Sequence, residues 1–239
     1  IVRWTRSMTR SSGSFAAMFA LVDTEVEVND IALDGGVSSW SGGQITLHGD
    51  LTAANGSQIA ATAAHTIYIA DDATPATTTI GVGANSLGSI DMGWSDGFTL
   101  DGSLDLLGSL IDTNADGIQT IVGAGAATPG ITVHGSSQLQ YTVFQNAALD
   151  TEIGDPIATA MNHVSFTAFA SDVTQLTMRG DSTDITIDYL SFDTGIASAR
   201  FIEGIGNNLV IRVAHPSPNA DPGLGRRSAN VVWMSIIVE

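Results

Sequence analysis

Short runs of alternating apolar and polar residues recur along the chain, and residues typical of turns separate them. The clearest examples are segments 173–179 and 184–190; in the second, Ile185, Ile187 and Tyr189 share one face. Such alternation predicts β-strands with one buried face. Because a glycine and an aspartate lie between the two segments, they are expected to pair as an antiparallel hairpin.

This spacing of strands and turns is typical of all-β sandwiches and barrels. We therefore predict an antiparallel β-sandwich, jelly-roll-like and with long loops. The N-terminal half leaves a parallel β-helix open as the alternative, because strand-like segments each followed by glycine or aspartate recur there at intervals of about 20–35 residues, too irregular for a clear repeat. These segments are Gln44–His48, Thr66–Ile69, Phe98–Leu100 and Ile131–His134.

The first residues differ in charge from the rest of the chain. Arg3, Arg6 and Arg10 lie within the first ten residues, and the first acidic residue is Asp23. This pattern predicts a basic N-terminal arm over residues 1–14 that reaches a neighbouring subunit or a genome.

Residues 15–239 are expected to form a single all-β domain, since all-β folds of this length are commonly one domain. Segment 215–228 holds three of the six prolines and predicts a long loop. Long ordered loops are often functional, and this one carries Arg226 and Arg227, which are candidate contact residues.

The net charge of −17 argues against nucleic-acid binding by the main body, because phosphate contacts need a basic surface. Cations are better partners for such a surface. With no cysteine, disulfides and thiolate metal sites are excluded. No apolar run approaches the ~20 residues that a membrane-spanning helix needs.

A candidate calcium site lies in the segment Asp112-Thr-Asn-Ala-Asp-Gly117. Asp112, Asn114 and Asp116 supply oxygen ligands at alternate positions, and the glycine allows a sharp turn, as in the first half of a calcium loop. Gly123 stands where an EF-hand has its bidentate glutamate, so this site would need acids from elsewhere in the fold.

Catalytic motifs are weak. Gly93-Trp-Ser-Asp-Gly97 matches the spacing of a nucleophile elbow around Ser95, but an alternating strand-like segment follows it where a helix is required. The five histidines are scattered and form no zinc-binding pattern. We therefore expect no enzyme activity.

Trp40, Tyr68, Trp94 and Tyr141 lie near glycine or polar segments and are candidates for a sugar-stacking platform. Their rings combine a flat apolar face with a hydrogen-bonding edge.

The leading functional hypothesis is a non-catalytic assembly subunit of an exposed surface, such as a virion coat or decoration protein or a cell-surface appendage, with copies of itself or coat subunits as neighbours. The alternative is a secreted, calcium-supported carbohydrate-binding module with a glycan partner. A polysaccharide-degrading enzyme is a third hypothesis, tied to the β-helix fold. All three imply an extracellular, cell-surface or virion location.

Overall fold

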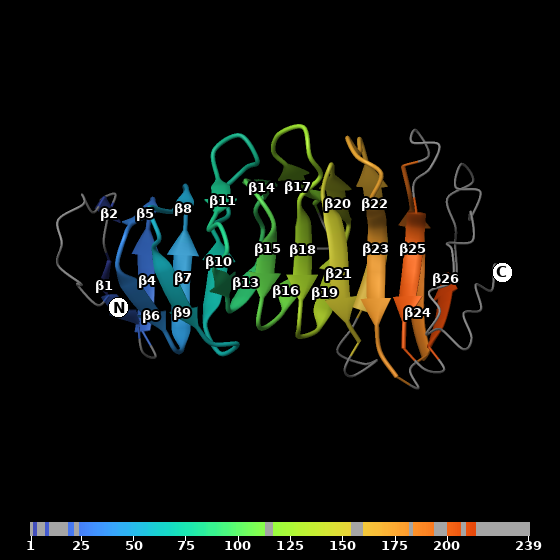
Figure 1. The fold of residues 1–239 in the computed structure, drawn as a ribbon, viewed down its shortest axis with the longest axis horizontal. Helices are drawn as coiled ribbons and strands as arrows, with labels where there is room; N and C mark the ends of the chain where they lie inside the picture. Colours follow the sequence, from blue (N-terminus) through green and yellow to red (C-terminus); the bar gives the residue numbers. More distant parts are fainter. Residues whose placement is uncertain are drawn as a thin grey trace.

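The computed structural model describes residues 2–3, 8–9, 19–21, 24–112, 117–153, 160–181, 184–193, 200–206 and 209–213. Over these residues the chain is all-β, as its sequence predicts, and winds into a parallel β-solenoid. Successive turns stack along the long axis, from the N-terminal strands at one end to β26 at the other (Figure 1). Each full turn contributes one strand to each of three rows.

The first row consists of β1 (Val2–Arg3), β4 (Thr24–Val28), β7 (Gly43–Leu47), β10 (Thr66–Ile69), β13 (Ser89–Asp91), β16 (Leu110–Ile111), β19 (Ser137–Gln140), β22 (Ala160–Thr167), β24 (Asp184–Ser191) and β26 (Val210–Val213). The second row consists of β2 (Met8–Thr9), β5 (Ile31–Asp34), β8 (Leu51–Ala54), β11 (Thr79–Gly81), β14 (Gly97–Leu100), β17 (Gln119–Gly123) and β20 (Thr142–Gln145). It continues through the C-terminal parts of β22 and β24, because each of these strands spans both rows.

The third row consists of β3 (Phe19–Leu21), β6 (Val37–Trp40), β9 (Gln58–Ala61), β12 (Ser86–Leu87), β15 (Leu104–Leu106), β18 (Gly130–Val133), β21 (Ala148–Glu152), β23 (Thr174–Arg179) and β25 (Arg200–Ile205). It forms a 3-stranded and a 6-stranded sheet, whereas the first two rows form one 17-stranded sheet.

The predicted antiparallel, jelly-roll-like sandwich is wrong, because every strand pairing among the described residues is parallel. The parallel β-helix, which the sequence left as the alternative, matches the structure. The expected hairpin at 173–190 fails for the same reason. Its two segments are strands, but β23 pairs with β21 and β25, whereas β24 pairs with β22 and β26.

Stacked apolar side chains fill the solenoid. In the first row Val26, Ile45, Ile67, Ile90 and Leu110 hold equivalent positions on five successive turns, and all five are buried. The steps between them are 19, 22, 23 and 20 residues, and the next step, from Leu110 to its partner Ser137, is 27. The strands therefore stay in register although the turns differ in length.

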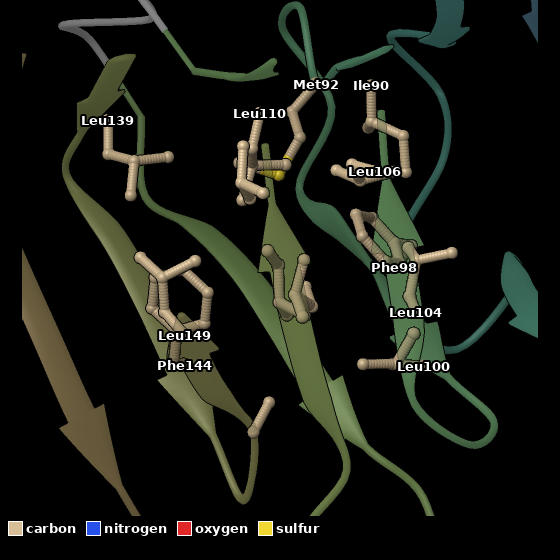
Figure 2. Packing of buried hydrophobic residues seen from close by; sticks show 14 of the residues in the cluster. Ile90, Met92, Phe98, Leu100, Leu104, Leu106, Leu110, Leu139, Phe144 and Leu149 are labelled. Carbon is tan, nitrogen blue, oxygen red and sulfur yellow. The ribbon is translucent and has the colours of Figure 1, made fainter. Parts of the chain in front are cut away.

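The second and third rows supply the other walls of this core (Figure 2). In the second row Phe144 and Phe166 stack with ring centroids 5.1 Å apart, and Phe192 extends the stack at 5.5 Å from Phe166. In the third row Leu104 is in register with Ile131 on the next turn. Burial of these columns excludes water from the inner side of the hydrogen-bonded ladders and supplies most of the driving force for folding.

Close stacking of turns requires glycine at position 97. Gly97 has φ of 113°, and a Cβ there would stand 1.9 Å from the carbonyl oxygen of Thr120 on the next turn. Gly102 also has a positive φ, of 90°, but a Cβ there would meet nothing within 4 Å. A comparison of the two positions therefore distinguishes the cost of the backbone conformation from the cost of the steric clash.

We predict that Gly97→Ala destabilises the protein far more than Gly102→Ala. Both substitutions carry the cost of a left-handed residue, about 1–2 kcal/mol, and Gly97→Ala adds an overpacking cost of about 1–3 kcal/mol. Urea denaturation followed by circular dichroism would measure the difference. Equal midpoints for the two variants would contradict the stacking at Thr120.

Candidate functional site

The corner between the first and second rows gathers exposed apolar side chains. Among the described residues, five large hydrophobic side chains are exposed, and three of them lie at this corner: Trp94, Ile118 and Tyr189, with exposed fractions of 60%, 63% and 44%. The other two, Val37 and Leu107, lie on or beside the third row. Exposed apolar groups that cluster are a sign of a binding surface.

The register of the strands aligns Ile118 and Tyr189 with two further rings and places Trp94 at the same corner. Ile118 precedes Gln119, which pairs with Thr142, so Ile118 and Tyr141 hold equivalent positions on successive turns. The same comparison relates Tyr141 to His163 and His163 to Tyr189. Gly97 pairs with Thr120, so Trp94 lies at this corner one turn before Ile118, displaced by one residue from the strictly equivalent position, which is Ser95. We call Trp94, Ile118, Tyr141, His163 and Tyr189 the corner strip.

Three rings of the corner strip stack face to face. The ring centroids of Tyr141 and His163 are 4.3 Å apart with their planes at 20°, and those of His163 and Tyr189 are 4.1 Å apart at 18°. Nδ1 of His163 lies 2.7 Å from Oδ1 of Asn162. The stack runs along the solenoid axis, so its edges line the corner.

A left-handed backbone turns these three side chains outward. Tyr141, His163 and Tyr189 have φ of 58°, 54° and 55°, a conformation that non-glycine residues seldom adopt. In each case the alternation of buried positions shifts by one residue: Leu139 and Thr142 both point inward, three positions apart, on either side of Tyr141. The prediction that Tyr189 shares a buried face with Ile187 is therefore wrong.

Tyr68 and two aspartates surround the Trp94 end of the corner strip. The hydroxyl of Tyr68 donates a hydrogen bond of 2.8 Å to Oδ1 of Asp71, and Asp91 accepts one of 2.9 Å from the backbone N–H of Gly93. Gly93 has φ of 52°, and a Cβ there would stand 2.3 Å from the Tyr68 oxygen, so glycine allows the ring to pack on this loop. Burial, with added effects of Asp71 and Asp91, raises the pKa of Tyr68 to about 12.

The fold brings three of the four predicted sugar-stacking residues to the same corner and buries the fourth. Tyr68 and Trp94 lie together, and Tyr141 lies farther along the same corner. Trp40 is fully buried against His65, with ring centroids 5.3 Å apart, so its assignment to the platform is wrong. Burial lowers the pKa of His65, which the hydrogen bond with the carbonyl of Gly42 opposes.

The predicted calcium segment joins β16 to β17 at the same corner, immediately before Ile118. Asp112 is fully buried, and its Oδ2 accepts a hydrogen bond of 2.6 Å from Thr142 Oγ1. Asn114 and Asp116 lie outside the described residues. Within the part of the chain that the structure describes, no group of three or more histidines and carboxylates is arranged to hold a metal ion. Calcium binding stays a prediction.

The predicted arm and loop residues are largely outside the described ranges. Arg3 belongs to β1, whereas Arg6, Arg10, Arg226 and Arg227 are not described. Ser95, at the centre of the nucleophile-elbow spacing, is buried and donates a hydrogen bond of 2.6 Å to the carbonyl of Met92. Over the described ranges, no helix has the length and apolar character needed to cross a membrane.

A second polar cluster lies on the outer face of the third row. His134 contacts Asp105 through Nε2 at 2.9 Å and Glu152 through Nδ1 at 3.4 Å. On the following turn, Arg179 donates two hydrogen bonds to Asp150, of 2.7 and 2.6 Å. Each of the two basic side chains contacts carboxylates of its own row, so we assign the cluster a structural role.

Sequence reasoning missed Ile118, His163 and Tyr189 as members of a site. Each lies 22 to 26 residues along the chain, or one turn of the solenoid, from the next ring of the strip. Only the strand register shows that these residues are neighbours in space. The available signal was an apolar or aromatic residue one position before an inward-facing residue on each turn.

The comparisons with known proteins give no relative: no family model, curated protein or solved structure matches the chain. Fold and site define its class as a parallel β-solenoid with an aromatic corner, and its function must be argued from that geometry.

The His134 cluster predicts a pH dependence of stability. Partial burial acts to lower the pKa of His134, but hydrogen bonds and charges from Asp105 and Glu152 outweigh it, so the pKa is raised. The resulting stabilisation is complete below the unfolded-state pKa, about 6.5, and is lost as the pH rises through the folded-state value. His134→Gln should therefore lower the melting temperature more at about pH 5.5 than at about pH 8.5.

Melting curves of both proteins across this range would measure the effect, which should stay below about 1 kcal/mol because the groups are exposed. A constant difference between them would show that His134 gains nothing from its carboxylates.

Proposed function

We propose that this β-solenoid is a carbohydrate-binding protein and that a glycan chain lies along the corner strip. The observation that carries the proposal is the strip itself: five successive turns each place an aromatic or apolar side chain at the same corner. Sugar rings have apolar faces that can lie on the exposed side chains of Trp94 and Ile118, and hydroxyls that can contact the edges of the three-ring stack and the polar side chains beside it.

The dimensions of the strip suit a linear polymer. Neighbouring strands are about 4.8 Å apart, so the four steps from Trp94 to Tyr189 extend over about 19 Å. A row of side chains at one per turn repeats on a scale similar to that of successive sugar units. Such a surface can bind several units at once, and each adds to the affinity without a deep pocket.

Polar side chains beside the strip provide hydrogen-bonding partners. On the first-row side these include Gln140 and Asn162, and on the second-row side Ser165, all half-buried. The strands fix the backbone of these residues, so only their side-chain rotamers have to be ordered when they bind a hydroxyl. Carbohydrate recognition implies an extracellular or surface location, in keeping with the alternative hypothesis from the sequence.

The strained backbone also supports a functional role. Each left-handed non-glycine residue costs on the order of 1–3 kcal/mol, whereas each stacked pair of rings returns about 0.5–1.5 kcal/mol. At the corner between the second and third rows, the equivalent left-handed positions that follow β20 and β22 hold Asn146 and Ala168. Aromatic residues are therefore not a requirement of such corners in this fold.

We predict that Trp94→Ala weakens glycan binding by about tenfold or more, because exposed aromatic anchors carry much of the energy of an interface. Affinity electrophoresis on a panel of immobilised polysaccharides, followed by calorimetry on the best ligand, would measure it. Tyr189→Ala should act in the same direction.

Leu107→Ala is the matched control, since Leu107 is also an exposed apolar side chain but lies beside the third row. The proposal fails if the Trp94 and Leu107 variants bind equally well, or if no polysaccharide retards the unchanged protein.

Calcium support of this surface is a separate proposal. Segment 112–117 connects directly to Ile118 of the strip, so an ion held there would stabilise the folded corner. Ligand binding to the folded state alone stabilises it by about 2.7 kcal/mol at a concentration 100 times the dissociation constant. Calcium should therefore raise the melting temperature and a chelator should reverse the effect.

Differential scanning calorimetry with calcium, with magnesium and with a chelator would test this. Identical curves in the three solutions would contradict calcium binding. They would not affect the glycan proposal, which the variants of Trp94 test separately.

A further inference from the structure

Acidic side chains gather at the Trp94 end of the corner strip. Asp71, Asp91 and Asp96 lie in β13 or in the loops that adjoin Tyr68 and Trp94, and Asp71 and Asp96 are exposed. Farther along, the first-row residues that precede Tyr141, His163 and Tyr189 are Gln140, Asn162 and Asp188, of which the first two are uncharged. The Trp94 end of the surface is therefore acidic.

No described arginine lies near this acidic end. The described arginines lie in β1, β23, β25 and β26, each at least three turns from Trp94. Three turns correspond to about 14 Å along the axis, which exceeds the Debye length of about 8 Å at physiological ionic strength. The carboxylates around Trp94 thus create a negative potential that these arginines do not cancel.

We propose that the sugar unit bound at Trp94 carries a protonated amino group, so that the preferred glycan is an amino-sugar polymer with free amines. An ammonium group is attracted by the face of an exposed tryptophan and by the adjacent carboxylates of Asp71 and Asp91. Uronic-acid polymers would be repelled by the same carboxylates. The inference rests on the proposed glycan function, and it names the class of ligand.

The two aspartates can be neutralised without loss of their structural hydrogen bonds. Asp71 accepts from the Tyr68 hydroxyl and Asp91 from the N–H of Gly93. In Asp71→Asn and Asp91→Asn the side-chain carbonyl oxygen can still accept these bonds, so only the charge is removed. Asp101→Asn is the matched control, because Asp101 is exposed but follows β14 at the far end of the second row.

The experiment is calorimetric titration of the full chain with two oligomers of equal length, one of glucosamine and one of its fully N-acetylated form. Acetylation removes the positive charge and leaves the stacking faces unchanged. We expect the free-amine oligomer to bind about three- to tenfold more tightly, as exposed charge and cation–π contacts allow. The double variant of Asp71 and Asp91 should reduce this ratio toward one, whereas the Asp101 variant should keep it.

Salt should act in the same way as the double variant, because at about 1 M ionic strength the Debye length falls to about 3 Å. Equal or tighter binding of the acetylated oligomer, with both oligomers weakened by Trp94→Ala, would overturn the amino-group assignment and leave glycan binding intact. Failure of both oligomers to bind, together with failure of neutral and uronic-acid oligomers, would overturn the proposed function itself.

Discussion

Parallel hydrogen bonding between successive turns is the constraint on which the rest of the structure depends. It fixes the spacing of the turns and places equivalent residues above one another, so a single position type repeats along the whole molecule. Inside, this produces columns such as the one from Val26 to Leu110. Outside, the same alignment produces the corner strip, so the core and the proposed binding surface have one origin.

The strands could be predicted from the sequence, but their partners could not. Alternation in β23 and β24 shows that one face of each is buried, and this is true of a sandwich and of a solenoid alike. The glycine and aspartate between them suit a hairpin turn and equally a solenoid corner. A regular sequence repeat would have favoured the solenoid over the sandwich. The spacing of equivalent residues varies from 19 to 27, however, so no regular repeat is visible in the sequence.

The candidate site was predictable in its residue types and not in its assembly. Trp94 and Tyr141 belong to the corner as aromatic residues near turns, whereas Trp40, chosen on the same grounds, is buried because the period-two alternation of β6 directs it inward. Tyr189 was misplaced because its left-handed backbone shifts the alternation by one residue. The pattern of apolar and polar residues does not reveal such a shift, because tyrosine is found on both buried and exposed faces of strands.

The variable length of the turns has an evolutionary consequence. Since the strands keep their register while a turn gains or loses up to eight residues, segments inserted at a corner are absorbed without disturbing the core. Residues 70–78, between β10 and β11, form one such segment: Asp71 accepts a hydrogen bond from Tyr68, and Ala73 accepts one from the backbone N–H of Asp96, two residues after Trp94. New specificity could therefore evolve by lengthening or replacing this segment, while the scaffold that presents the rings is inherited unchanged.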